Sequence, residues 1–172
     1  MFSHVTPENY EPQLEEKRIS METLFAEFDL PKTEIFRSEP QNYRLRAEFR
    51  LWHEGDDLFF IMFNKETKEK FKVESFPVAS KLINSAMQVL LNDIRDKKVL
   101  RERLFQVDFL STKSGELLIS MLYHKPLDDE WQNQTMALRD RLNTQLGKVD
   151  IVGRARKQKV ILEKNLSEHS LR

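Results

Sequence analysis

The chain has 172 residues, with 28 basic and 28 acidic side chains, 40% hydrophobic residues, 4 glycines and no cysteine. This composition is typical of one or two globular domains and excludes an intrinsically disordered chain. Without cysteine the sequence has no disulfide, no cysteine-ligated zinc or iron–sulfur cluster and no thiolate nucleophile. The glycines form neither a GxGxxG nor a GxxxxGK spacing, so a phosphate-binding loop of the nucleotide-cofactor type is not expected.

No secretion signal or membrane-spanning segment is recognisable in the sequence. The first residues lack a basic stretch followed by an apolar core. The longest apolar run, from Leu58 to Phe63, is far shorter than the roughly 20 residues needed to span a bilayer. We therefore expect a cytoplasmic protein.

The charges are unevenly distributed although their total is zero. Residues 8–29 hold seven acidic and two basic residues, a net charge of −5, whereas residues 148–164 hold six basic and two acidic residues, a net charge of +4. The basic segment favours a polyanionic partner, because the local field acts at a binding face and the net charge does not. An ordinary solvated surface explains the same counts, and both interpretations stay open at this point.

An amphipathic helix is predicted in the first thirty residues. Its apolar residues fall three, four and seven positions apart, with acidic residues between them. They are Leu14, Met21, Leu24, Phe25 and Phe28. Because Pro12 suits the first turn of a helix, we expect the helix to begin near Glu11 and to end before Pro31.

The clearest strand pattern runs from Tyr43 to Trp52. Apolar and mostly charged residues alternate there, which is the two-residue period of a strand with one buried face. The outward residues are predicted to be Arg44, Arg46, Glu48, Arg50 and Trp52. Guanidinium groups at this spacing near an indole suit phosphate binding and base stacking. A solvated face with ion pairs to Glu48 explains the pattern equally well.

The remaining elements alternate between pairs of strands and single helices. Further strands are expected at residues 58–63, 71–73, 104–110, 117–123, 149–152 and 160–162, and further helices after Pro77 and from Leu127 to Gly147. The order is one helix, then strand–strand–helix twice, then a final hairpin. Because hairpins pair strands antiparallel, the expected fold class is α+β, an antiparallel sheet with flanking helices. We expect a helix region at 1–30, an α+β domain at 31–164 and a truncated polar tail at 165–172.

No catalytic or metal-binding constellation is visible. The histidines are scattered without an HxH or HExxH pair, at positions His4, His53, His124 and His169. A turn explains the acid pair Asp56-Asp57, and helix capping explains Asp128-Asp129. Phe105 with Gln106, and Tyr123 with His124, are groups of the kind that hold unstacked RNA bases, although aromatic residues in strands more often belong to a core.

Eight short blocks carry a resemblance that covers nearly the whole chain in order and at compatible spacing. They are Phe36-Arg37-Ser38, Tyr43 to His53, Gly55 to Leu58, Ser75-Phe76-Pro77, Leu104-Phe105-Gln106, Leu122 to Lys125, Leu127 to Trp131 and Gly153-Arg154-Ala155. Together they resemble the N-terminal half of bacterial tRNA (uracil-5-)-methyltransferases. The ribosomal-RNA relatives of these enzymes typically carry iron–sulfur cysteines, which this sequence lacks.

The resemblance implies S-adenosylmethionine-dependent methylation of C5 of a T-loop uridine in tRNA. In this family a cysteine thiolate adds to C6 of the uracil, the enolate takes the methyl group at C5, and a carboxylate removes the C5 proton. These groups belong to a C-terminal α/β methyltransferase domain that we expect to be absent here. The expected function is therefore that of an N-terminal fragment that binds the tRNA T-arm and is inactive alone. The alternative is a stand-alone RNA-binding module without catalytic activity.

The resemblance also implies which residues contact the T-arm. Phe105 and His124 are expected to pack against loop bases, and Arg50 to hold a phosphate or a base edge. Strand facing and local charge add the weaker candidates Gln106, Arg44, Arg46 and Arg154. We expect no catalytic, cofactor-binding or metal-binding residue and no iron–sulfur cluster in the chain. The expected partners of the monomer are tRNA and other RNAs with a T-arm-like hairpin, and no membrane.

Overall fold

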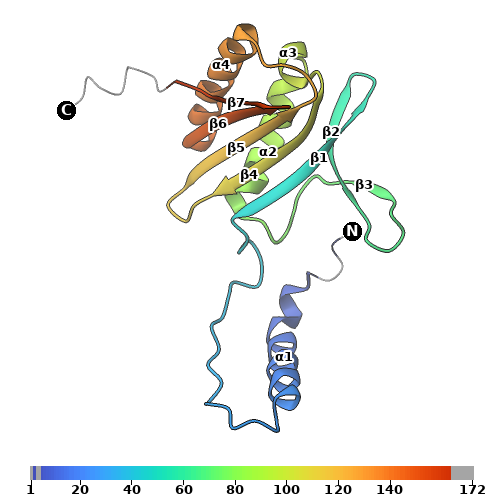
Figure 1. Ribbon diagram of the computed structural model, residues 1–172, viewed down its shortest axis with the longest axis vertical. Helices are drawn as coiled ribbons and strands as arrows, with labels where there is room; N and C mark the ends of the chain where they lie inside the picture. The colour runs from blue at the N-terminus through green and yellow to red at the C-terminus, as the bar shows by residue number, and fades with distance from the viewer. Residues whose placement is uncertain (1, 3–4, 164–172) are drawn as a thin grey trace, which may run out of the picture.

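A computed structural model describes residue 2 and residues 5–163 of the chain. Figure 1 shows a twisted sheet with helices on one side of it and an N-terminal helix that stands apart. The predicted polar tail at residues 165–172 lies outside the described residues. The division into regions 1–30, 31–164 and 165–172 therefore stays a prediction.

One seven-stranded sheet organises the described part of the chain, in the order β3-β2-β1-β4-β5-β6-β7. Its strands are β1 (Arg46–Glu54), β2 (Asp57–Phe63), β3 (Lys70–Lys72), β4 (Leu104–Ser111), β5 (Glu116–Tyr123), β6 (Lys148–Ala155) and β7 (Gln158–Ile161). All neighbours pair antiparallel except β5 and β6, which are parallel. The predicted α+β class is confirmed, and the parallel pair follows from the helix that connects β5 to β6 and returns the chain in the same direction.

Three helices accompany the sheet, and two of them begin at a side-chain cap. They are α2 (Lys81–Ile94), α3 (Lys98–Arg101) and α4 (Asp129–Leu146), and all three lie on one side of the sheet in Figure 1. The Ser80 hydroxyl accepts the N–H of Ile83 at the start of α2, and the Asp128 carboxylate accepts the N–H of Trp131 at the start of α4. None of the described helices is both long and apolar enough to span a membrane.

The hydrophobic core lies between the sheet and these helices. Phe49 of β1 packs against Phe60 of β2 and Phe109 of β4, with ring centroids 5.4 and 6.2 Å apart. On the helix side, Ile83, Ala86, Leu90 and Ile94 of α2 are fully buried. Because strand side chains alternate, burying one face of each strand leaves its other face directed away from the helices.

The N-terminal helix differs from its prediction in length and in packing. A short 3-10 turn, η1 (Pro7–Asn9), leads into α1 (Tyr10–Leu24), which ends well before Pro31 because residues 25–28 form turns. No residue of α1 is buried, and Leu24 and Phe28 are 73% and 59% exposed. Apolar spacing predicted the helix, but within the described residues no element packs on its apolar side. Polar contacts attach it to the following segment, including an ion pair between Glu11 and Arg37.

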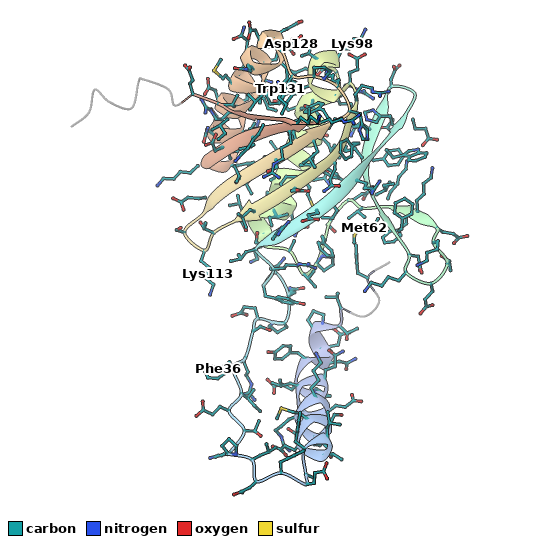
Figure 2. The ribbon with its side chains drawn as sticks, in the orientation of Figure 1. Phe36, Met62, Lys98, Lys113, Asp128 and Trp131 are labelled. Carbon is teal, nitrogen blue, oxygen red and sulfur yellow. The ribbon has the colours of Figure 1, made fainter. Side chains whose placement is uncertain are left out.

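A close contact between α4 and β6 fixes the position of the last hairpin. The Trp131 side chain of α4 is fully buried, labelled in Figure 2, and lies over Gly153 of β6. A Cβ atom at residue 153 would overlap the Trp131 ring and would lie 2.6 Å from Cδ1 of Leu127. Glycine is therefore required here for packing, and it holds β6 in place beside β5 with Arg154 on the opposite face.

We predict that Gly153→Ala destabilises the fold by about 1–3 kcal/mol, because the added methyl group overpacks this contact. Urea unfolding followed by circular dichroism measures the loss. The control Gln145→Ala, at an exposed position of α4, should stay within about 0.5 kcal/mol of the unmodified chain. Equal midpoints for Gly153→Ala and the unmodified chain would contradict the packing described here.

A second link joins α2 to α4 through a two-pronged ion pair. Nε and Nη2 of Arg141 each donate to a carboxylate oxygen of Asp93 at 2.8 Å. Burial alone would raise the pKa of Asp93, but the hydrogen bonds from Arg141 and the charges of Arg141 and Lys97 outweigh it and lower the pKa below its ordinary 3.8. The folded chain therefore holds this carboxylate in its charged form more firmly than the unfolded chain does.

This pair predicts a pH dependence of stability. Because the pKa of Asp93 is lower in the folded chain, its contribution is complete above pH 3.8 and is lost as the pH falls through the folded pKa. Arg141→Gln should cost about 0.5–1 kcal/mol at neutral pH, given that Arg141 is half-exposed and screened. The difference from the unmodified chain should shrink as the pH falls below 3.8. The control is Arg37→Gln, which removes the exposed ion pair with Glu11 and should change the free energy of unfolding little at any pH. If the stability difference between Arg141→Gln and the unmodified chain widens in acid, the pKa shift of Asp93 does not arise from Arg141.

Candidate nucleic-acid interface

The face of the sheet opposite the helices carries one continuous row of paired side chains. Arg50 of β1 lies opposite Gln106 of β4 and Ile61 of β2. Residues that are directly paired across strands point to the same face, so the register extends this row over all seven strands. We call it the cross-sheet row, and it consists of Lys72, Ile61, Arg50, Gln106, Leu122, Arg154 and Lys159. At about 4.8 Å per strand it is roughly 29 Å long.

The sequence pattern predicted this face correctly on β1. Arg46, Glu48 and Arg50 are exposed, whereas the alternating residues Phe49 and Leu51 are buried in the core. The buried residue Ile61, which belongs to the row, is absent from the core cluster on the helix side. The row therefore lies on a face of its own, separated from the core by the thickness of the sheet.

The cross-sheet row is cationic and its guanidinium groups are available. It contains four basic residues and no acidic one. Within the described residues, the side chains of Arg50, Arg154 and Lys159 make no hydrogen bond or ion pair. An unpaired guanidinium group on an exposed strand presents several N–H donors to an anion at once. Nearby acids on this face are already engaged, since Asp108 accepts a hydrogen bond from the Gln106 amide at 2.8 Å.

At one end of β4 and β5, an aromatic pair adjoins the row. The rings of Phe105 and His124 are stacked, with centroids 3.8 Å apart and planes 12° from parallel. A β-bulge between Leu104 and Gln106 places Phe105 outside the regular pairing. His124 comes directly after β5 and is held by a hydrogen bond from its backbone N–H to the carbonyl of Arg103.

The aromatic pair lines a pocket of about 750 Å³. Its wall combines apolar groups with several cations: Arg103, Phe105, Leu122, Tyr123, His124, Lys125, Pro126, Arg154, Ala155, Arg156 and Gln158. Leu122 and Arg154 belong to the cross-sheet row as well, so the pocket and the row form one surface. Stacked rings beside guanidinium groups are the combination that holds an unpaired nucleobase and its phosphate.

Five of the seven predicted RNA contacts therefore come together, and two do not. Arg50, Gln106, Arg154, Phe105 and His124 lie on the row or in the pocket. Arg46 is in an ion pair with Glu48. Arg44 precedes β1, where its backbone pairs with residues 78–80. At about 3.3 Å per residue, Arg44 lies roughly 20 Å along the strand from Arg50.

Sequence reasoning missed three cations of the pocket and left the role of one aromatic residue open. The missed cations are Arg103, Lys125 and Arg156. Arg156 was noted only as part of the basic segment and Lys125 only as part of a family-like block, whereas no sequence signal pointed to Arg103. Tyr123, noted beside His124, is a core residue whose hydroxyl donates to the Leu100 carbonyl at 2.6 Å. Burial raises the pKa of the Tyr123 hydroxyl well above its ordinary value, so this group remains a neutral structural donor.

The described residues do not fit S-adenosylmethionine. In doubly wound folds a glycine-containing loop after a parallel strand opens onto a free helix N-terminus. The one comparable connection here, from β5 to α4, runs from His124 to Asp128 without glycine, and the Asp128 carboxylate already caps the helix. Among the residues that the structure describes, no group of three or more histidine or acidic side chains is placed to hold a metal ion.

Comparison with known proteins shows which family the sequence resembles. The sequence model described as tRNA (Uracil-5-)-methyltransferase matches residues 9–172. A tRNA/tmRNA (uracil-C(5))-methyltransferase of Colwellia psychrerythraea is 58% identical over 171 residues, which cover 99% of this chain and 47% of the relative.

Proteins of the same name from other bacteria are similar as well. Those of Aliivibrio fischeri and Vibrio cholerae are 52% and 49% identical over 161 residues, which cover 94% of this chain and 44% of each relative. The chain thus spans somewhat less than half the length of the curated relatives that it matches.

Proposed function

The chain belongs to the tRNA (uracil-5-)-methyltransferase family, and from this premise we propose that it is the RNA-binding part of such an enzyme. The observation that carries the proposal is the continuity between the cationic cross-sheet row and the Phe105–His124 pocket. The proposed ligand is the T-arm of tRNA. The relatives are named for both tRNA and tmRNA, so a T-arm-like hairpin of tmRNA is a second proposed ligand.

Phosphates of the hairpin would lie along the cross-sheet row. Arg50 and Arg154 stand on strands three positions apart in the order β1-β4-β5-β6, a separation of about 14 Å. Two free guanidinium groups at this separation can hold phosphates of different nucleotides. Gln106, between Arg50 and Leu122, offers an amide for a base edge or a ribose hydroxyl.

The aromatic pair determines where a base would stack. Because the rings of Phe105 and His124 are already in contact at 3.8 Å, no base fits between them. Phe105 is half-buried and His124 is exposed, so an extruded loop base would stack on the outer face of the imidazole. Such a stack is worth about 1–3 kcal/mol, which offsets the few kcal/mol that extrusion costs.

We propose that the 172 residues bind RNA without methylating it. The sequence contains no cysteine to add to the uracil ring, and its described residues do not fit the methyl donor. In the proposed enzyme, S-adenosylmethionine would supply the methyl group when bound to other residues. We also propose that the chain binds RNA as a monomer in the cytoplasm, because tRNA, the proposed ligand, is a cytoplasmic RNA in bacteria and the row and the pocket need no residue from a second chain.

Substitutions on the surface test the proposed binding. Phe105→Ala and Arg50→Gln should each weaken binding of a T-arm hairpin by about 1–3 kcal/mol. The first removes the ring that holds the His124 imidazole in place for stacking, and the second removes a phosphate contact. Fluorescence anisotropy of a labelled hairpin measures the affinity. Arg46→Gln is the matched control, because Glu48 already neutralises this guanidinium group, and its effect should be small. Unchanged affinity in both test variants, or an equal loss in Arg46→Gln, would contradict the surface assignment.

An assay of methyl transfer tests the division between binding and chemistry. The chain incubated with unmodified tRNA and labelled S-adenosylmethionine should transfer no label, whereas the complete Colwellia psychrerythraea relative under the same conditions should. The reason is the missing thiolate. Incorporation of label into tRNA by the 172-residue chain would contradict the proposal that the chain binds RNA without methylating it.

A further inference from the structure

A second group of aromatic and cationic side chains lies on the same face, at the opposite edge of the sheet. Trp52 of β1 is paired with Phe59 of β2. The Lys70 ammonium lies 3.1 Å from the centroid of the Trp52 ring system, and that of Lys72 lies 3.8 Å from the centroid of Phe59. We call these four residues the Trp52 cluster. It adjoins the cross-sheet row, because Lys72 is a member of both and Trp52 is two residues from Arg50.

The positions of Lys70 and Lys72 are not explained by the protection of an edge strand alone. Lysines on an edge strand such as β3 ordinarily point into water and discourage pairing with another chain. Here both ammonium groups lie over ring faces, and neither has a carboxylate partner within the described residues. Trp52 remains 38% exposed. The cluster therefore keeps two unneutralised cations next to an accessible indole.

These groups suit an unpaired nucleotide. A nucleobase stacks on an indole face irrespective of its sequence, and lysines beside it contact the flanking phosphates. An ammonium group over an exposed ring is held weakly, so Lys70 can turn to a phosphate when a base takes its place on the ring. The exchange replaces one weak contact by a stack and a charge-assisted hydrogen bond.

We propose that the Trp52 cluster is a second RNA subsite, which binds an unpaired nucleotide outside the hairpin held at the Phe105–His124 pocket. The inference rests on the proposed function. Lys72 and Arg154 stand at opposite ends of six neighbouring strands, about 24 Å apart. One RNA bound at both places has to carry an unpaired nucleotide outside the stem and loop of the hairpin, as the complete tRNA does and an isolated T-arm hairpin does not.

Tryptophan fluorescence reports on the cluster directly. The chain has two tryptophans, and Trp131 is 0% exposed, so an emission change on RNA binding comes from Trp52. Titration with complete tRNA should quench the emission saturably, and titration with the T-arm hairpin should leave it unchanged. In Trp52→Phe the quench should disappear while the buried emission of Trp131 remains.

Affinities of two variants complete the test. Trp52→Leu should weaken binding of complete tRNA about tenfold and leave hairpin binding unchanged; Phe36→Leu, at an 88% exposed aromatic residue off the sheet, is its control. Lys70→Gln should lower the slope of log affinity against log salt by about 0.7. Lys113→Gln, on the β4–β5 turn labelled in Figure 2, should not lower it.

Three results would overturn the inference. If saturating tRNA leaves the emission unchanged while Phe105→Ala still weakens hairpin binding, the second subsite is absent and the proposed function stands. If neither RNA binds, both fail. If Trp52→Leu weakens binding of the T-arm hairpin as much as binding of complete tRNA, the Trp52 cluster does not bind a nucleotide outside the hairpin.

Discussion

The pairing of β1 with β4 is the constraint on which the rest of the structure depends. These two strands are the junction between two strand–strand–helix units, and their register sets Arg50 opposite Gln106. Through β4 the same register reaches Leu122 of β5 and Arg154 of β6. A slip of one residue would turn Arg50 toward the core and Phe49 toward solvent. Burial of Phe49 against Phe60 and Phe109 therefore fixes the cationic face as well as the core.

The charge of this surface depends on which side chains form ion pairs and not on the net charge of the chain. The chain as a whole is neutral, yet the cross-sheet row holds four basic residues and no acidic one. Arg46 and Arg50 are equivalent in the sequence pattern, but Glu48 neutralises Arg46, whereas Arg50 has no ion-pair partner among the described residues. Local pairing thus concentrates the uncompensated positive charge of β1 at Arg50.

Much of the fold was predictable from the sequence, because alternation and capping signals are local. The outward residues of β1 and the Asp128 cap of α4 are where the pattern placed them. The bulge at Phe105 and the row across all strands depend on register between distant segments, which no local pattern encodes. For the N-terminal helix the local pattern predicted the helix correctly but not its packing, because its apolar residues stay exposed. Phe105 and His124 became the main candidates for RNA contact through the family resemblance, because physical reasoning alone left both RNA binding and the core open for them.

The central claim is that RNA binds the open face of the sheet and not the helix-covered face. Ultraviolet cross-linking of the chain to unmodified tRNA, followed by mass spectrometry of the cross-linked peptides, tests it most directly. The account predicts adducts within residues 103–106 and 122–126, which line the pocket around the stacked pair. Adducts confined to the outer surfaces of α2 and α4, with none on β4 or β5, would contradict it.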